Sequence, residues 1–482
     1  MIHFKEIGKI MGALLVLIGL LMLPGVGFSV YFEEDPWPVL SSAVITIIIG
    51  TTLFFSFSKQ DQNIRKREGY LIVSLSWLFM AGFGMLPFVL SHEISSFSDA
   101  LFETTSGITT TGASILNDIE AMPKGLLFWR SMLQWIGGLG IIVLTVAIFP
   151  LLGIGGIELF VAESPGPTSD KVHPRISETA KRLWYVYVGL TIAATALYWV
   201  GGMTFYDAIN HALTTLATGG FSTKNASMAY YDSAFIQYTA IVFMFLAGTN
   251  FTVIYFGLVG KFRRVLKSDE FKAYAFIVML ISIALFFPIY AKMGTDAELA
   301  FRKSAFQVVS LITTTGFVSD DYTQYGNGVT FICFILLFVG ASAGSTAGGI
   351  KFVRHLTFFK NSYLEFKRLV HPRAIVPLMI NGDRVTGRII THIMNFLLIY
   401  LLTFVFGAFV MSIMGYDLQT SLGAVATCLG NVGPGIGKVG PVDNFAFLSS
   451  TAKVFLSFIM LLGRLELFTI LILFTPFFWR AN

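Results

Sequence analysis

Charged residues are scarce in this sequence. Asp, Glu, Lys and Arg make up 13% of its 482 residues, whereas 55% are hydrophobic and the mean hydropathy is +0.73. A soluble domain of ordinary composition carries about 25% charged residues. The composition therefore argues against a soluble protein and indicates membrane-spanning helices, because a β-barrel has short alternating strands instead of long apolar runs.

Cysteine and recognisable catalytic motifs are also missing. The two cysteines, Cys333 and Cys428, lie in apolar segments and have no zinc-ligand spacing. The sequence contains no Walker loop, no dinucleotide fingerprint and no set of nucleophile and base within the apolar segments. We therefore expect a protein that is not an enzyme, carries no cofactor of its own and has no nucleic-acid partner.

Residues 1–69 contain two predicted spans, about 8–31 and 39–58. The first is too long for the core of a signal peptide and is followed at once by the second. The basic segment 59–67 is predicted to be cytoplasmic, which places the N-terminus on the same side. These two transmembrane spans precede the rest of the chain in the sequence.

Four repeats follow, at 70–182, 183–272, 273–388 and 389–482. Each has a span, a short helix, a Thr/Gly-rich loop and a second span. The first spans are 70–91, 183–201, 273–291 and 389–414, the short helices 98–107, 206–216, 301–312 and 418–428, and the second spans 124–150, 233–258, 328–359 and 449–478. A helix of ten residues reaches only about 15 Å, so it enters the membrane without crossing it. Ten spans place both termini in the cytoplasm, where most Lys and Arg then lie.

The four Thr/Gly-rich loops, which we call the filter loops, are predicted to form one cation site. They are Thr110-Thr111-Gly112, Thr218-Gly219-Gly220, Thr314-Thr315-Gly316 and Asn431-Val432-Gly433. Backbone carbonyls can replace the hydration shell of a monovalent cation, and glycine allows the conformations that point successive carbonyls inward. Asn431 and Val432 replace two threonines, so the site need not be exactly four-fold symmetric. The expected ligand is a monovalent cation.

Acidic residues accompany these loops. Asp99 and Asp207 each lie thirteen residues before a filter glycine, and we expect them to cap the short helices. Further acids in the predicted outer segments, among them Glu103, Asp320 and Asp321, would concentrate cations near the pore. Ordinary solvated loops explain most of these acids equally well.

The second span of repeat three is interrupted by an intramembrane loop at 340–350, rich in small residues. We expect its glycines, Gly340, Gly344, Gly348 and Gly349, to be the hinges of a gate below the filter. A small-residue surface for close helix packing is the alternative. Arg464 lies within the last predicted span, where a charge is costly. We expect it to face the permeation path and to act with the loop as a barrier; a buried bridge to another helix is the alternative.

One tetrapeptide occurs in two predicted cytoplasmic linkers, as Val172-His173-Pro174-Arg175 and Val370-His371-Pro372-Arg373. Proline favours a turn, and the histidine and arginine offer donors to a partner. We assign His173, Arg175, His371 and Arg373 as candidate contacts with regulatory subunits. Shared ancestry without function is an equally good explanation.

The order of these elements resembles the Trk/Ktr/HKT superfamily of potassium transporters, most closely its bacterial TrkH-type branch. The resemblance covers essentially the whole chain and includes the stretches 134–140, 340–349, 431–435 and 463–466. It implies a multi-pass homodimer in the bacterial inner membrane, with one pore per subunit and a cytoplasmic ring of nucleotide-binding RCK-type subunits that gates it. In this superfamily serine at the first filter glycine accompanies sodium preference, so Gly112 favours potassium.

The sequence therefore predicts an all-α polytopic membrane protein that mediates gated potassium uptake through a four-repeat pore. The alternative is a secondary transporter that couples potassium to protons or sodium. Such transporters often have inverted repeats and buried acids at mid-membrane. These repeats run in parallel topology, and Glu466 is the only acid in the interior of a predicted span.

Overall fold

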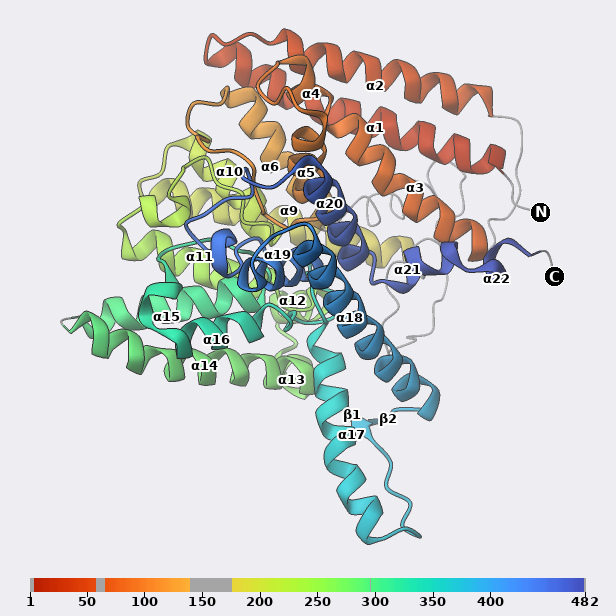
Figure 1. Cartoon of the computed structure of the whole chain (residues 1–482), viewed down its shortest axis with the longest axis vertical. Helices are drawn as coiled ribbons and strands as arrows, with labels where there is room; N and C mark the ends of the chain where they lie inside the picture. Colours follow the sequence, from red (N-terminus) through yellow and green to blue (C-terminus); the bar gives the residue numbers. More distant parts are fainter. Residues whose placement is uncertain (1–3, 58–65, 139–175, 295, 481–482) are drawn as a thin grey trace.

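The computed structural model describes residues 4–57, 66–138, 176–294 and 296–480, and these are mostly helical (Figure 1). Six spans in this part of the chain are long and apolar enough to cross a membrane. They are α1 (Phe4–Tyr31), α2 (Trp37–Ser56), α3 (Lys66–Gly84) with α4 (Leu86–Leu90), α9 (Ile176–Val200), α14 (Asp269–Met293) and α18 (Gly387–Ile413). The chain is an all-α, multi-pass membrane protein, as the sequence predicted.

Two predicted spans are not continuous helices. The span at 233–258 is α11 (Ala234–Ala247) and α12 (Phe251–Leu258), bent by 110°. The span at 449–478 is α20 (Ser450–Arg464), followed after a bend of 108° by α21 (Phe468–Leu471), η5 (Ile472–Phe474) and α22 (Pro476–Trp479). The side chain of Asn250 caps α12, and Glu466 and Leu467 have positive φ at the second break. Arg464 is therefore the last residue of α20, at the break between the two parts of this predicted span.

The other second spans are short where the structure describes them. Helix α6 (Lys124–Gly138) begins as predicted, and the remainder of its expected span, up to residue 150, lies outside the described residues. Helix α16 (Asn327–Leu336) ends at the intramembrane loop, and α17 (Phe352–Val370) begins directly after it. Residues 337–351, which include the predicted interruption at 340–350, form turns and irregular structure instead of helix.

Four short helices, one in each repeat, lead into the filter loops. They are α5 (Phe97–Ile108), α10 (Phe205–Leu216), α15 (Ala297–Ile312) and α19 (Leu418–Gly430). With 12, 12, 16 and 13 residues, they are too short to cross a bilayer. Most of their residues are buried, including hydroxyl groups such as Thr104 and Thr215. Protein therefore surrounds these re-entrant helices, as membrane depth requires.

The predicted N-caps are wrong by three residues. Thr204 caps α10, because its hydroxyl oxygen accepts a hydrogen bond from the Asp207 amide over 3.1 Å. Asp207 lies in the first turn, where its carboxylate accepts a hydrogen bond from the Thr204 hydroxyl. Asp99 likewise lies in the first turn of α5, after Ser96. Negative charge in a first turn is still favourable, because it faces the positive end of the helix dipole.

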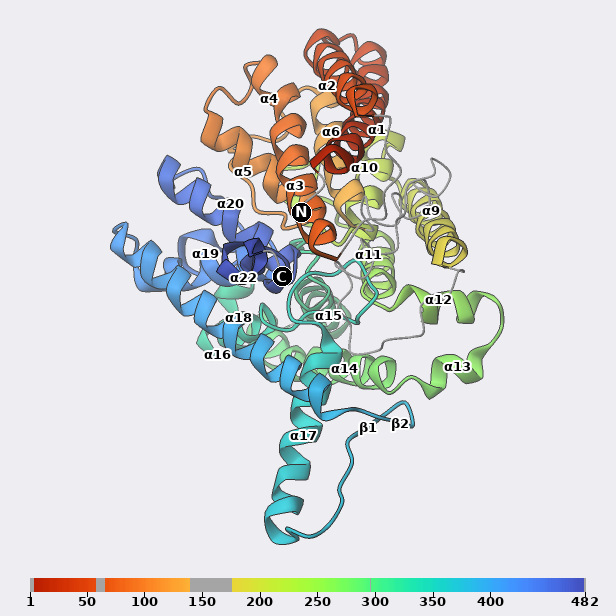
Figure 2. The same ribbon diagram turned by 90° about the vertical axis from the view of Figure 1, so that its right-hand side faces the viewer.

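The beginning and the end of the described chain lie on one side of the molecule (Figure 1). Arg67, at the start of α3, donates a hydrogen bond to the Phe477 carbonyl of α22. Helix α17 projects well beyond the body in both views (Figures 1 and 2). The segment between α17 and α18 contains β1 (Met379–Ile380), which pairs antiparallel with β2 (Asp383–Arg384). The shorter elements are α13 (Phe262–Lys267), η2 (Ser227–Tyr230), η3 (Tyr322–Tyr325) and η4 (Gly437–Val439).

Candidate ion pore

The four filter loops share one backbone conformation. In each loop two residues, separated by one, have positive φ. The pairs are Thr110 (53°) and Gly112 (80°), Thr218 (53°) and Gly220 (72°), Thr314 (56°) and Gly316 (75°), and Asn431 (53°) and Gly433 (103°). Asparagine tolerates this left-handed region better than most residues. Asn431 therefore occupies the position of a filter threonine in repeat four, as the alignment of the glycines predicted.

The filter loops close into a ring. Each filter glycine faces the carbonyl oxygen that precedes the filter glycine of the next repeat, and a Cβ atom added to it would overlap with that oxygen. Gly112 faces the Gly219 carbonyl, Gly220 faces Thr315, Gly316 faces Val432, and Gly433 faces Thr111 of repeat one. We call these four carbonyls the filter ring. A ring of backbone carbonyls is the type of ligand with which ion filters replace the hydration shell of a monovalent cation.

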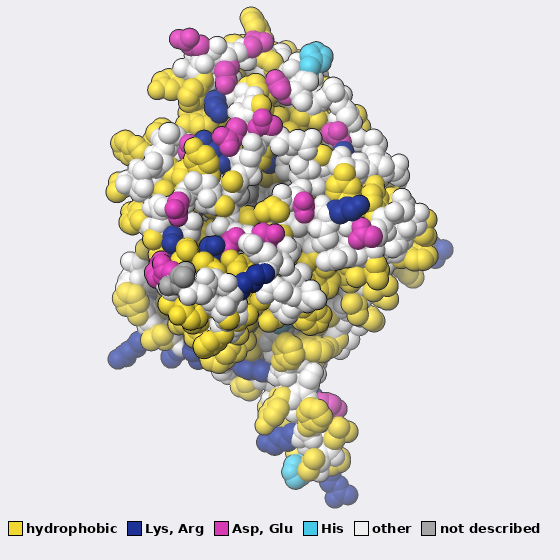
Figure 3. All heavy atoms as spheres, turned by 60° about the vertical axis from the view of Figure 1, so that its left-hand side comes forward, with side chains coloured by type: hydrophobic (Ala, Val, Ile, Leu, Met, Phe, Trp, Pro, Cys, Tyr) yellow, Lys and Arg dark blue, Asp and Glu magenta, His cyan; other side chains and the backbone are white. Residues whose placement is uncertain are grey.

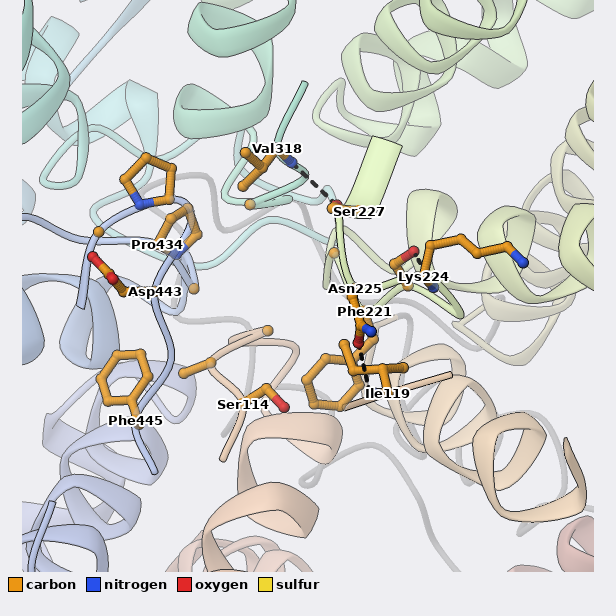
Figure 4. Close-up of a pocket in the computed structure, with 18 of the residues that line it drawn as sticks. Ser114, Ile119, Phe221, Lys224, Asn225, Ser227, Val318, Pro434, Asp443 and Phe445 are labelled. Carbon is orange, nitrogen blue, oxygen red and sulfur yellow. Dashed lines mark hydrogen bonds between the residues drawn. The ribbon is translucent and has the colours of Figure 1, made fainter. Parts of the chain in front are cut away.

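All four filter glycines also line one cavity of about 100 Å³. Its walls come from all four repeats, with Ser114 and Ile119 from the first, Phe221 from the second, Val318 from the third and Pro434 from the fourth (Figure 4). Lys224 also belongs to the lining, but its side chain extends away from the labelled residues around it (Figure 4). We call this cavity the vestibule of the filter ring.

The predicted acids do not line this vestibule. Glu103 pairs with Arg130 over 2.6 Å, and both side chains are almost fully buried. Asp99 pairs with Lys453 of α20, and Asp320 pairs with Lys303, each over 2.7 Å. In the view of Figure 3, acidic and basic side chains are interspersed around a hollow in the surface. These pairs neutralise most of the charge that the sequence suggested for attracting cations, and Asp443 is the acid that lines the vestibule.

The intramembrane loop contacts the third and fourth filter loops. The Gly348 amide donates a hydrogen bond over 2.7 Å to the hydroxyl of Thr314 in the third filter loop. A Cβ atom at Gly348 would lie 2.8 Å from Cβ of Asn431 in the fourth. Gly340 pairs with Ile350 across the base of the loop. Gly344 and Gly349 have positive φ, so two of the four predicted hinges require glycine conformations.

The break between α11 and α12 holds the other end of this loop. The Ser342 amide donates to the Gly248 carbonyl over 3.0 Å, and Asn250 donates to the Ala343 carbonyl over 2.7 Å. The Glu270 carboxylate accepts the Ala343 amide over 2.7 Å. A bend that the sequence did not predict in repeat two therefore supports the loop of repeat three.

Arg464 connects the intramembrane loop to repeat one. Its guanidinium donates to the Thr346 carbonyl over 2.8 Å and to the carbonyls of Gly137 and Gly138 at the end of α6. The side chain is half-buried. The nearby Glu466 carboxylate forms an ion pair with Arg354 of α17. Arg464 thus contacts the intramembrane loop and also bridges to α6. That it faces the permeation path as a barrier stays a prediction.

Residues 38–289 and 292–481 match the family of TrkH cation transport proteins. The chain belongs to this family.

Its relatives cover it almost completely. The Trk system potassium uptake protein TrkH of Salmonella typhimurium is 39% identical over 99% of this chain and its own full length, and TrkH of Escherichia coli K12 is 38% identical with the same coverage. The crystal structure of the potassium transporter TrkH from Vibrio parahaemolyticus superimposes with a TM-score of 0.89 at 37% identity and covers 99% of this chain. TrkH proteins are transporters, which agrees with the absence of catalytic motifs in the sequence.

The repeated tetrapeptide can be located in one of its two copies. His371 and Arg373 are exposed where α17 ends, on the projecting part of this TrkH-family chain. His173 and Arg175 lie outside the described residues.

Three polar side chains that were not singled out from the sequence contact the filter loops, the residues that follow them or the short helices that lead into them. Arg130 donates to the Ser222 carbonyl beyond the second loop, and its guanidinium lies 3.4 Å from the centre of the Phe221 ring. Gln134 contacts the second loop from the same helix. Lys453 reaches Asp99 from α20. The sequence did contain a signal for these three residues, because each is a polar side chain within a predominantly apolar helix.

Proposed function

We propose that this chain mediates potassium uptake across the inner membrane through a pore in each subunit, with the filter ring as its selective site. The closure of four equivalent glycine–carbonyl contacts into one ring is the observation that carries the proposal. Glycine at all four filter positions fits the potassium reading of the sequence. The names of its relatives, which are potassium uptake proteins at 38–39% identity, support the same ion.

The intramembrane loop and Arg464 form the gate in this proposal. The loop lies beneath the filter loops and is attached to them by the bond between Gly348 and Thr314. Arg464 adds a positive charge to the same level and holds the loop through Thr346. A cation leaving the filter ring would meet both, so opening requires the loop and the guanidinium to move together.

A cytoplasmic nucleotide-binding subunit of the RCK type controls this gate in our proposal, and the chain acts as a homodimer with both termini in the cytoplasm. The projecting α17 supports a docking role, because it leaves large apolar side chains uncovered in this single chain. These are Phe359, Tyr363, Phe366, Leu369 and Val370. His371 and Arg373 follow them directly and offer hydrogen-bond donors to a partner.

Uptake of radioactive rubidium into liposomes tests the pore. The purified chain, without any partner, is reconstituted and a potassium gradient is imposed. We expect uptake that sodium competes with poorly and that needs no proton gradient. Uptake that appears only when a proton or sodium gradient is imposed would overturn the pore in favour of a coupled transporter.

Binding of the regulatory subunit tests the docking surface separately. We expect Arg373→Ala and Phe366→Ala to weaken co-purification with the purified regulator while rubidium uptake by the chain alone is unchanged. Unchanged binding in both variants would remove α17 from the proposed interface.

A further inference from the structure

Gln134 of α6 holds the second filter loop at two points. Its side-chain amide nitrogen donates to the carbonyl oxygen of Gly219 over 2.6 Å, and its amide oxygen accepts the Phe221 amide over 3.0 Å. The side chain is fully buried. One glutamine therefore fixes the backbone on both sides of Gly220, the filter glycine of repeat two.

Gln134 also explains why the second loop departs from the others. Gly219 occupies the position that Thr111, Thr315 and Val432 hold in the other repeats. A Cβ atom at Gly219 would overlap with the Gln134 side chain. Gln134 and Gly219 thus form a size-complementary pair, in which the glutamine occupies the space that a filter side chain fills elsewhere.

The carbonyl that Gln134 contacts belongs to the filter ring. The Gly219 oxygen is the atom that Gly112 faces across the boundary between repeats one and two. Within the described residues, the equivalent oxygens of Thr111, Thr315 and Val432 accept no protein hydrogen bond. A carbonyl oxygen can accept two bonds. The Gly219 oxygen therefore has one acceptor site occupied by an N–H group, which weakens its attraction for a cation.

Helix α6 gives Gln134 a fixed position. A Cβ atom at Gly137 would overlap with the Ile108 carbonyl at the end of α5, and one at Gly138 would lie 2.7 Å from Cα of Ala217 at the end of α10. The two glycines let α6 pack directly against the backbones that lead into the first and second filter loops. A functional side chain has to be held within about 0.5 Å of its working geometry, and close packing of its helix provides such support.

We propose that Gln134 is a specificity-determining residue, which fixes the Gly219 carbonyl and lowers its field so that the filter ring disfavours the smaller sodium ion. This inference rests on the proposed function, because it assigns a role in the same filter. The filter ring is then asymmetric, because three of its carbonyls accept no protein hydrogen bond within the described residues and one accepts a hydrogen bond from a side chain.

Gln134→Met tests the proposal, because methionine is similar in length but has no amide. Gln307→Met is the matched control. Gln307 is also buried and donates to a backbone carbonyl, that of Asp320, which is not in the filter ring. Both variants are reconstituted, and the potassium/sodium ratio is measured from reversal potentials in mixed salts. We expect Gln134→Met to lower the ratio by about two- to tenfold, the equivalent of one net hydrogen bond, and Gln307→Met to leave it unchanged.

A pair of substitutions that moves side-chain bulk from position 134 to position 219 separates the role of the Gln134 amide from a role in packing alone. Gly219→Thr alone should abolish uptake, because the new side chain meets Gln134. Adding Gln134→Ala should restore rubidium uptake with a potassium/sodium ratio that stays below that of the unmodified chain. If Gln134→Met does not fold, the double variant still tests the proposal.

An unchanged ratio in Gln134→Met would overturn the proposal, as would a double variant with the ratio of the unmodified chain. If the unmodified chain does not discriminate potassium from sodium, the proposed function is overturned instead. Failure of the double variant to recover any uptake would contradict the size-complementary pair.

Discussion

Arg464 donates a hydrogen bond to the Thr346 carbonyl over 2.8 Å, so the last residue of α20 holds the intramembrane loop. Removal of this guanidinium takes away a positive charge below the filter ring and one attachment of the loop. We expect Arg464→Ala to raise rubidium uptake into liposomes at least severalfold in the absence of any partner. Arg464→Lys keeps the charge but not the forked contacts and should give an intermediate rate.

Arg388→Ala provides the control for charge alone, because Arg388 is exposed at the start of α18. We expect it to have no effect on uptake. Equal uptake by Arg464→Ala and the unmodified chain would show that Arg464 is only a structural bridge between α20 and α6.

Substitutions at the filter glycines should differ in severity according to the space at each site. The overlap that an added Cβ atom would make with the neighbouring carbonyl decreases in the order Gly316, Gly220, Gly112 and Gly433. All four have positive φ, so alanine or serine is also strained there. We expect Gly112→Ser to lower the potassium/sodium ratio and Gly316→Ser to lower it further or abolish uptake.

Reversal potentials in mixed potassium and sodium salts measure these ratios. Gly202→Ser serves as a control, since Gly202 also has positive φ but a Cβ atom there meets no neighbour. If Gly112→Ser leaves the reversal potential unchanged, Gly112 does not belong to the selective site.

The buried pair of Glu103 and Arg130 should matter mainly for stability. Arg130→Met leaves the carboxylate of Glu103 buried without its partner, and removal of one member of such a pair costs about 3–5 kcal/mol. Glu103→Gln added to Arg130→Met removes the unpaired charge and should recover part of the loss. The midpoint of thermal unfolding in detergent, measured for both single variants and the double variant, gives the coupling. Strictly additive effects would contradict a direct interaction.

Asp443 should affect cation entry rather than selectivity. It is the acid among the residues lining the vestibule, and its field is screened over about 10 Å at 0.1 M salt. We expect Asp443→Asn to reduce uptake at low ionic strength and to have little effect at high salt. Uptake rates measured at both salt concentrations check this, and an equal reduction at both would indicate a structural effect. Asp232→Asn, at an exposed acid outside the vestibule lining, is the control.

The positions of the filter loops were predictable because their signal is local. In each of the first three repeats, the filter glycine (Gly112, Gly220 or Gly316) follows a short helix. The same order of elements pointed to Gly433 in repeat four, although the residues next to it differ. The conformation of Asn431 agrees, since its φ of 53° equals that of Thr110 and Thr218. The intramembrane loop was equally visible as a run of small residues.

The ion pairs and the breaks were not predictable, because they depend on contacts between distant segments. Lys453 meets Asp99 from the fourth repeat, and no spacing in the sequence relates the two. Leu467 adopts positive φ, which its residue type disfavours, and its side chain is fully buried at the break after α20. Tertiary packing overrides the local preference there.

Helix α6 contacts the filter ring and the gate within one turn. Gln134 bonds to the Gly219 carbonyl, and the carbonyls of Gly137 and Gly138 accept hydrogen bonds from Arg464. Any displacement of this turn that accompanies release of Arg464 also displaces the amide that fixes the filter. In the proposed mechanism, ion preference and open probability are therefore not separate traits, and a variant selected for altered opening is expected to show altered discrimination between ions.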